Sequence, residues 1–571
     1  MQDVIVIGAG PSGLAALKEM LTHDLSVTAI ERSAGYGGVF RANNPAVYED
    51  LYLTTSNYFM AFSDFAPLEP EAHYSSKAGY QRYLDAYVEH FDLLPHIRFE
   101  TRVSRARFDA ATDRWIVDVV DAEGEHTLEA RHLIVATGSQ QEPHRPEFEG
   151  YTGRVLHSSD YRGREEFEGK RVLVVGIGES ASDIAGEISE VAAETVVWSR
   201  RPFIVAPRYP VASMARGYDE NATLEARPES LAKVNELLEI LSTSRMSNQL
   251  PLAAFGLVRI GMFTAIRNVP SISDVAKCAV RWNDVAMNRN FWMQDQSVVV
   301  TKTMRLPVAA CAGKLGVVVA PRARFEGLRV EFEAPLLDER RPETGDDFDV
   351  IVACTGFKTE LPWLESEIEV NPRAWFRHCF PPEHEGRLAF LGWARPHQGG
   401  LPAAAELLAR YVALLATGQA SLPKDLPARI AEEAQIERRY YRGSPHVDTL
   451  VDYPAFMDSV ADLVGCRPRM PNPLLEPKRF LQFWTYPNWP CWYRKDGVGR
   501  DPRALDAALA SAGVDVGAMI PLVSLHFLLW AVTAPLVALD RLVGGGRGDR
   551  LGPGWLVRRP KRTLLHRSEV G

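Results

Sequence analysis

Few cysteines and no excess of basic residues limit what this chain of 571 residues can be. Its six cysteines include no C-x-x-C pair, which argues against a zinc site or a redox-active disulfide and fits a reducing compartment. The formal net charge is −9, so electrostatics gives no reason to expect a nucleic-acid partner. We find in the sequence no pattern typical of a catalytic triad, a carboxylate dyad or a metal cluster. The chain is also too long for a single hydrophobic core.

What the sequence does contain is a glycine-rich turn between an apolar strand, 4–7, and a helix expected over 12–21. The turn consists of Gly8, Ala9, Gly10, Pro11, Ser12 and Gly13. Glycines make such a turn tight and let a pyrophosphate approach the backbone N–H groups of the helix N-terminus. The next strand, 26–30, ends at Glu31 and Arg32. A carboxylate at that position accepts the hydrogen bonds of a ribose diol, so we predict an FAD site here.

A second turn of the same kind follows the strand 172–175. It runs from Gly176 to Ala181 and includes Gly178 and Ser180. The strand after its helix, 195–198, ends in Ser199, Arg200 and Arg201, with no acidic residue. A carboxylate would repel a 2′-phosphate whereas paired guanidiniums bind one, so NADPH is favoured over NADH. The alternative is that the two arginines are solvated loop charges.

The order of the remaining patterns predicts an α/β fold with two dinucleotide-binding, Rossmann-like domains. A helix is expected over 78–91 and a hairpin over 115–125. Two similar buried strands end in Thr137-Gly138 and in Thr355-Gly356, where the chain should cross between domains. The NADPH domain is therefore inserted into a discontinuous FAD domain. The expected ranges are 1–162 for the first part of the FAD domain, 163–341 for the NADPH domain with a helical insertion, 342–512 for the second part, and 513–571 for an apolar and then basic tail.

A short segment between the two turns narrows the class of protein. Residues 151–161 follow the pattern F-x-G-x-x-x-H-x-x-x-[FWY], with Tyr151 in the first place. This resembles the fingerprint of the class B flavoprotein monooxygenases, and Tyr161 resembles the flavin-containing monooxygenases more than the related Baeyer–Villiger enzymes. The resemblance extends over 1–510 and includes four further segments: the FAD loop Gly38-Val39-Phe40, 60–65, Pro402 to Arg410 with Glu406 between them, and 493–497.

The resemblance implies an enzyme similar to N,N-dimethylaniline monooxygenase, with FAD and NADPH as cofactors and O2 as co-substrate. NADPH would reduce FAD, and a C4a-hydroperoxyflavin would oxygenate a nucleophilic nitrogen or sulfur of a small or lipophilic substrate. His157 is interpreted as a structural residue near the domain junction. Three alternatives stay open: a Baeyer–Villiger enzyme acting on ketones, a disulfide reductase (disfavoured by the missing C-x-x-C), and a non-catalytic flavin-binding redox sensor.

The sequence departs from the family pattern in three places. Thr54 occupies the position of the family's active-site asparagine, and Asn57 follows three residues later, so either side chain could serve the flavin. Glu179 stands where the family usually has asparagine beside the NADPH phosphates, with which a carboxylate would compete. The stretch between Arg201 and Arg305 is longer than expected; its apolar segments 250–258 and 291–292 suggest a substrate lid, a membrane-facing surface or a packed insertion.

The last apolar segment, 516–539, has 24 residues without Asp, Glu, Lys or Arg and precedes a basic tail. A single span would place that tail opposite the catalytic domain, against the positive-inside tendency. We therefore expect a kinked, peripheral or re-entrant segment on the cytoplasmic face of a membrane. The alternative is a helix packed on the protein's own surface. A first strand at residue 4 leaves no room for a secretory signal, so a cytoplasmic protein is expected. The sequence names neither the substrate nor the oligomeric state.

Overall fold

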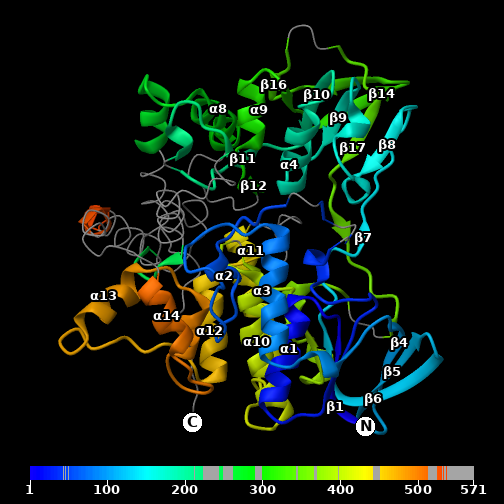
Figure 1. The fold of residues 1–571 in the computed structure, drawn as a ribbon, viewed down its shortest axis with the longest axis vertical. Coiled ribbons are helices and arrows are strands. Elements are labelled where there is room, and N and C mark those ends of the chain that lie inside the picture. Colours follow the sequence, from blue (N-terminus) through cyan, green and yellow to red (C-terminus); the bar gives the residue numbers. More distant parts are fainter. Residues whose placement is uncertain are drawn as a thin grey trace.

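The computed structural model places two sheet-containing domains one above the other (Figure 1). It describes residues 1–42, 44, 47–48, 51–210, 212–220, 222, 243–247, 261–289, 299–341, 345–365, 369–396, 398–441, 450–511, 524–529, 531–532 and 535. The expected apolar segments 250–258 and 291–292, and most of 516–539 with the basic tail, lie outside the described residues. No helix among the described residues is long and apolar enough to cross a membrane.

The first domain is built on a sheet with strand order β19-β4-β5-β6-β1-β2-β3, in which β20 also pairs with β6. Strand β1 is parallel to β2 and to β6, with Ile5 opposite Thr28 and Leu133. The predicted hairpin is present as β5 and β6, which turn at residues 122 and 123. The strand bounds are β1 Gln2–Ile7, β2 Val27–Ile30, β3 Ile97–Arg98, β4 Arg102–Asp109, β5 Arg114–Asp121, β6 Gly124–Val135, β19 Leu364–Glu365 and β20 Leu388–Phe390.

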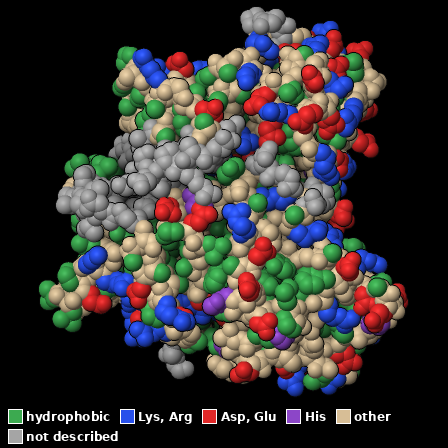
Figure 2. Space-filling view, in the orientation of Figure 1, with side chains coloured by type: hydrophobic (Ala, Val, Ile, Leu, Met, Phe, Trp, Pro, Cys, Tyr) green, Lys and Arg blue, Asp and Glu red, His purple; other side chains and the backbone are tan. Residues whose placement is uncertain are grey.

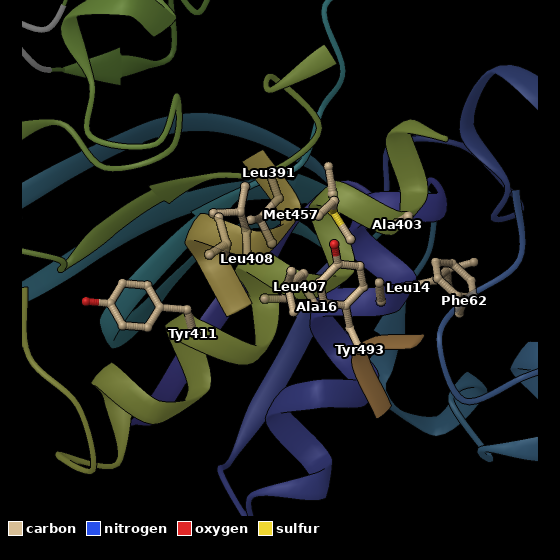
Figure 3. Close-up of a cluster of buried hydrophobic side chains, with 14 of the residues drawn as sticks. Leu14, Ala16, Phe62, Leu391, Ala403, Leu407, Leu408, Tyr411, Met457 and Tyr493 are labelled. Atoms are coloured by element: carbon tan, nitrogen blue, oxygen red, sulfur yellow. The ribbon is translucent and has the colours of Figure 1, made fainter. Parts of the chain in front are cut away.

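Helices cover this sheet and form the largest core of the molecule. Helix α1, Pro11–Thr22, packs against α10, Leu401–Ala416, which in turn packs against α12, Tyr453–Val464. The apolar faces of the three helices meet, and Leu14, Leu407 and Met457 lie together at their junction (Figure 3). The other helices of this domain are α2 Asn57–Met60, α3 Lys77–His90, α11 Leu426–Tyr441, α13 Pro477–Thr485 and α14 Arg503–Ser511.

The second domain has a six-stranded sheet of order β16-β13-β10-β9-β17-β8. All neighbours are parallel except β16, which closes one edge antiparallel to β13. Its inner strands are almost wholly buried and rich in valine, as expected for a parallel sheet covered on both faces. The strands are β8 Arg154–His157, β9 Arg171–Val175, β10 Glu194–Ser199, β13 Gly316–Val319, β16 Leu337–Glu339 and β17 Val350–Ala353. The helices are α4 Glu179–Ile188, α8 Asp274–Arg289 and α9 Arg305–Cys311.

The boundaries of this second domain differ from the expected range 163–341. Strands β8 and β17 lie outside that range, yet both belong to the second sheet because β17 pairs with β9 on one side and β8 on the other. The chain crosses between the domains just beyond them. There β7, Glu142–Pro143, pairs antiparallel with β18, Phe357–Lys358, so the outgoing and returning segments hold each other.

Candidate functional site

The first glycine turn is shaped by its close approach to the end of β6. Gly8 has a φ of +104°, and a Cβ there would lie 2.6 Å from the carbonyl oxygen of Ala136. A Cβ on Gly13 would collide with the carbonyl oxygen of Gly8. Helix α1 begins after Gly10, and no side chain caps its first N–H groups. Those donors therefore stay available for an anion, and Thr137 and Gly138 follow directly at the sheet edge.

Glu31 and the loop 38–40 complete this site. One carboxylate oxygen of Glu31 accepts from the Ala9 N–H and the other from the Ser33 N–H, both at 2.9 Å. The loop forms a short 3-10 helix, Gly38–Phe40, and a Cβ on Gly38 would lie 3.0 Å from the Cα of Gly10. The structure thus gathers the predicted FAD residues around the start of α1, except that Arg32 is exposed beside them. These features fit a dinucleotide: a turn that has no room for side chains, N–H groups of α1 that no side chain caps, and a carboxylate.

The second turn repeats the construction of the first. Its Gly176 has a φ of +124°, and a Cβ there would collide with the carbonyl oxygen of Cys354. The Gly176 N–H donates to Trp198 O at 2.9 Å, as the Gly8 N–H donates to Ile30 O at 2.8 Å. Gly178 precedes α4 and faces open space, while Ser180 is exposed and Ala181 buried. The same open helix N-terminus therefore lies at the edge of each sheet.

Arg200 and Arg201 lie where β10 ends. Both are exposed, and neither forms an ion pair with another described residue. The Ser199 hydroxyl donates to the carbonyl oxygen of Arg201 at 2.7 Å, which fixes the backbone of this turn. The two guanidinium groups are thus free to meet a phosphate beside the second turn.

The structure shows how the side chain of Asn57, one of the two candidates for the flavin-facing residue, is bound. The Asn57 amide donates to the carbonyl oxygens of Glu69 and Glu71 at 3.1 and 3.0 Å. Its oxygen accepts from the His73 N–H at 3.1 Å. Both amide hydrogens are used within the 57–73 loop, so Asn57 would have to exchange these bonds to serve the flavin. The roles of Thr54 and Asn57 at the flavin stay predictions.

Lys302, which no sequence pattern marked, connects the Thr54 loop to the second turn. Its ammonium donates to the carbonyl oxygen of Thr54 at 2.7 Å and lies over the ring of Tyr74. Its backbone N–H donates to a carboxylate oxygen of Glu179 at 2.7 Å. Lys302 follows β12, Val299–Thr301, so a residue of the second domain contacts a loop of the first domain at the expected junction of the two cofactors.

Behind the second turn lies a buried group of charged side chains. Arg208 is fully buried, 4.0 Å from Asp183 and 3.6 Å from Glu220. Tyr48, from the first domain, donates its hydroxyl hydrogen to Asp183. Burial, helped by Asp183 and Glu220 and opposed by Arg208, raises the pKa of Glu179 to about 7. The start of α4 therefore carries a carboxyl that titrates near neutral pH.

The fingerprint residues 157 and 161 are buried and make contacts in the second domain, beside the point where the chain crosses between the domains. His157 Nδ1 accepts from the Ser159 N–H at 3.1 Å, so Nε2 donates to Gly356 O at 3.0 Å, beyond Thr355 on the returning chain. Burial lowers the pKa of His157, which keeps this neutral form. The Tyr161 hydroxyl donates to Glu187 on α4 at 2.8 Å. These contacts support the structural interpretation of His157.

The remaining family-like motifs meet in a second buried network, inside the first domain. Glu19, Asp64 and Glu406 bring their carboxylates close enough to hold a metal ion. The Arg494 guanidinium contacts all three, and the Lys18 ammonium contacts Glu19 and Asp64. Cations therefore already compensate the charge of the carboxylates. The network connects α1, the 60–65 segment, α10 and the 493–497 segment.

Known proteins match this chain over most of its length. The model of the "flavin-binding monooxygenase-like" family matches residues 1–276 and 330–516. A 4-hydroxybenzoate brominase (decarboxylating) from Marinomonas mediterranea is 36% identical over 86% of this chain and 90% of that protein. Flavin-containing monooxygenase 5 of Oryctolagus cuniculus is 28% identical over 87% of this chain and 89% of that protein. The S-allyl-L-cysteine S-oxygenase of Allium sativum shares the fold, with a TM-score of 0.55 at 17% identity over 90% of this chain and 97% of that one.

Proposed function

Because the chain belongs to the flavin-binding monooxygenase-like family, we propose that it is an NADPH- and O2-dependent monooxygenase that transfers one oxygen atom to a soft nucleophile. One observation carries the proposal. Two glycine turns of the same construction face the edges of two sheets, and Lys302 connects the second turn to the Thr54 loop of the first domain. This arrangement suits two dinucleotides whose reactive rings meet between the domains.

Each cofactor has a set of residues that fits it. The first N–H groups of α1, with Glu31 and the loop 38–40, would hold FAD, and the start of α4, with Arg200 and Arg201, would hold NADPH. When bound, NADPH supplies the electrons and FAD the activation of O2. The chain itself contributes orientation through the two turns and shielding from water through the packed domain junction.

Two nucleophiles are compatible with this chemistry. The brominase relative, at 36% identity, favours a halide with a phenolic carboxylic acid as its acceptor. Bromide, O2, NADPH and two protons would give hypobromous acid, water and NADP+. Hypobromous acid would then replace the carboxyl group of the acid by bromine, with release of CO2 and water. The fingerprint residue Tyr161 favours instead an organic nitrogen or sulfur, although its hydroxyl is bound to Glu187 and would act on substrate choice only indirectly.

The test is product identification with the purified full-length protein. We would incubate it with NADPH, O2 and 4-hydroxybenzoate, with and without sodium bromide, and in parallel with a tertiary amine, a thioether and a cyclic ketone. A brominated phenol formed only with bromide supports the halide; an N-oxide or sulfoxide carrying oxygen from 18O2 supports the organic nucleophile. A lactone would mean Baeyer–Villiger chemistry. Hydrogen peroxide alone, with every substrate, would contradict the proposal and indicate an NADPH oxidase, and no oxidation of NADPH at all would favour the redox sensor.

A further inference from the structure

Glu179 presents an unusual group to the place where the second turn receives a pyrophosphate. It is the first residue of α4, directly after Gly178. Oε1 accepts the Lys302 N–H at 2.7 Å, whereas Oε2 is enclosed and has no hydrogen-bond partner among the described residues. As a carboxylate, this group would place a negative charge beside the phosphates and leave an enclosed acceptor oxygen without a hydrogen bond.

The charged groups around Glu179 do not compensate that negative charge. Arg208 is the buried cation that acts on Glu179, and it is shared with Asp183 and Glu220 at 4.0 and 3.6 Å. Arg305, at 3.6 Å from Asp183, is shared in turn with Glu187. The Lys302 ammonium is bound to Thr54 O. From the first domain, Tyr48 contributes only a hydroxyl, which it gives to Asp183. Among the groups named here, the four carboxyls, Glu179 included, outnumber the three cations.

A neutral carboxyl would resolve this conflict. It offers one acceptor and one donor, whereas an ionised carboxylate offers acceptors only. Oε1 accepts the hydrogen bond of the Lys302 N–H, so in the neutral acid the proton is on Oε2. We propose that Glu179 binds NADP(H) as the neutral acid, with Oε1 held by the Lys302 N–H and Oε2 protonated, so that no negative charge lies beside the phosphates of the dinucleotide. The inference rests on the proposed function, in that the second turn must hold NADP(H).

Cofactor binding should then take up a proton from solvent at alkaline pH. The free enzyme's Glu179 has a pKa of about 7, raised by its burial, so its neutral fraction falls about tenfold per pH unit above neutrality. If only the neutral form binds, the apparent Kd for NADP+ rises about 50-fold between pH 7 and pH 9. The 2′-phosphate of the cofactor has a second pKa near 6, as phosphate monoesters do, so it changes little over this range.

The experiment is calorimetric titration of the full-length protein with NADP+, which requires no turnover. Titrations at pH 7, 8 and 9, in two buffers of different ionisation enthalpy, measure both the Kd and the number of protons taken up. The wild type should take up close to one proton at pH 8, and its Kd should rise as stated. Glu179→Gln keeps an acceptor and a donor in place, so its Kd should vary less than about threefold and its proton uptake should vanish.

The matched control is Glu190→Gln, which should behave as the wild type. Glu190 lies just beyond α4, is half-exposed and pairs with Arg164. The wild-type proton count alone decides the question if the Glu179 variant does not fold. Binding without proton uptake, or the same pH slope in wild type and Glu179→Gln, would overturn the role of Glu179 while leaving the proposed function intact. NADP+ that binds at no pH would overturn both.

Discussion

Arg494 offers the most demanding test of the packing between the segments that build the first domain. Its guanidinium is only 5% exposed, and it donates to Ser63 Oγ at 2.8 Å. It also lies 2.9 Å from Asp64 and 3.1 Å from Glu406, and contacts Glu19. We propose the change Arg494→Met, which keeps an unbranched apolar stem and removes the guanidinium with its charge.

The expected effect is large because three buried carboxylates would share the remaining cations, Lys18 and Arg410. Breaking a buried ion pair from one side costs about 3–5 kcal/mol of stability, since the other charge stays buried and unpaired. In a domain of this size that loss lowers the Tm by roughly 10 °C.

The loss of stability in Arg494→Met should depend on pH through the pKa of Glu19. Although burial alone would raise the pKa of Glu19, Arg494 and Lys18 lower it to about 2. In the variant this pKa rises, so the folded protein takes up protons more readily as the pH falls. The stability deficit should therefore be larger at pH 8 than at pH 5.

The assay is thermal unfolding of variant and wild type, followed by circular dichroism at both pH values. The control is Arg503→Met, because Arg503 is 89% exposed although it pairs with Asp501 at 2.6 Å. That pair is a solvated surface pair, so no measurable change in Tm is expected. A Tm of Arg494→Met within 2 °C of the wild type, or equal to that of the control, would refute the reasoning.

Three further changes test the two cofactor sites. Arg200→Ala with Arg201→Ala should raise the KM for NADPH at least about tenfold and leave that for NADH nearly unchanged, because only NADPH carries the 2′-phosphate; equal losses in steady-state assays would contradict the assignment. Lys302→Met removes the 2.7 Å bond to Thr54 O but keeps the backbone bond to Glu179, so more NADPH should end as hydrogen peroxide while the Kd for NADP+ changes little. In Lys302→Arg the peroxide yield should return part of the way to that of the wild type. An unchanged peroxide yield in Lys302→Met would argue against a role for the contact between Lys302 and Thr54. Gly8→Ala places a Cβ 2.6 Å from Ala136 O at a φ of +104°; the purified protein should lack the yellow absorbance of FAD, and full FAD occupancy would show that the turn is not the binding site.

The surface drawn in Figure 2 carries side chains of both charge signs. On the face drawn in Figure 2, basic and acidic side chains are interspersed over both domains. The net charge of −9 agrees with that distribution. A polyanion would meet alternating signs on this face rather than a continuous basic surface.

Local patterns in the sequence carried the prediction of two nucleotide sites. A strand, a glycine turn and a helix follow one another within about twenty residues, and the glycines are required by contacts such as that between Gly8 and Ala136. The family resemblance likewise rested on short motifs, and the family match confirms it. The exact domain boundaries were harder to predict, because β8 and β17 join the second sheet through pairing between distant residues.

The amino-acid sequence by itself determined the two turns, the α/β class and the family, because each depends on residues that are neighbours along the chain. Only the tertiary structure decided how Asn57 is used, since its amide partners belong to a loop that returns to it after twelve to sixteen residues. It also brought Glu19 and Arg494 together, and placed Lys302 between Thr54 and Glu179. The contacts of Glu19, Arg494 and Lys302 join residues from about 120 to 475 positions apart, and they follow from how the chain packs within and between the two domains.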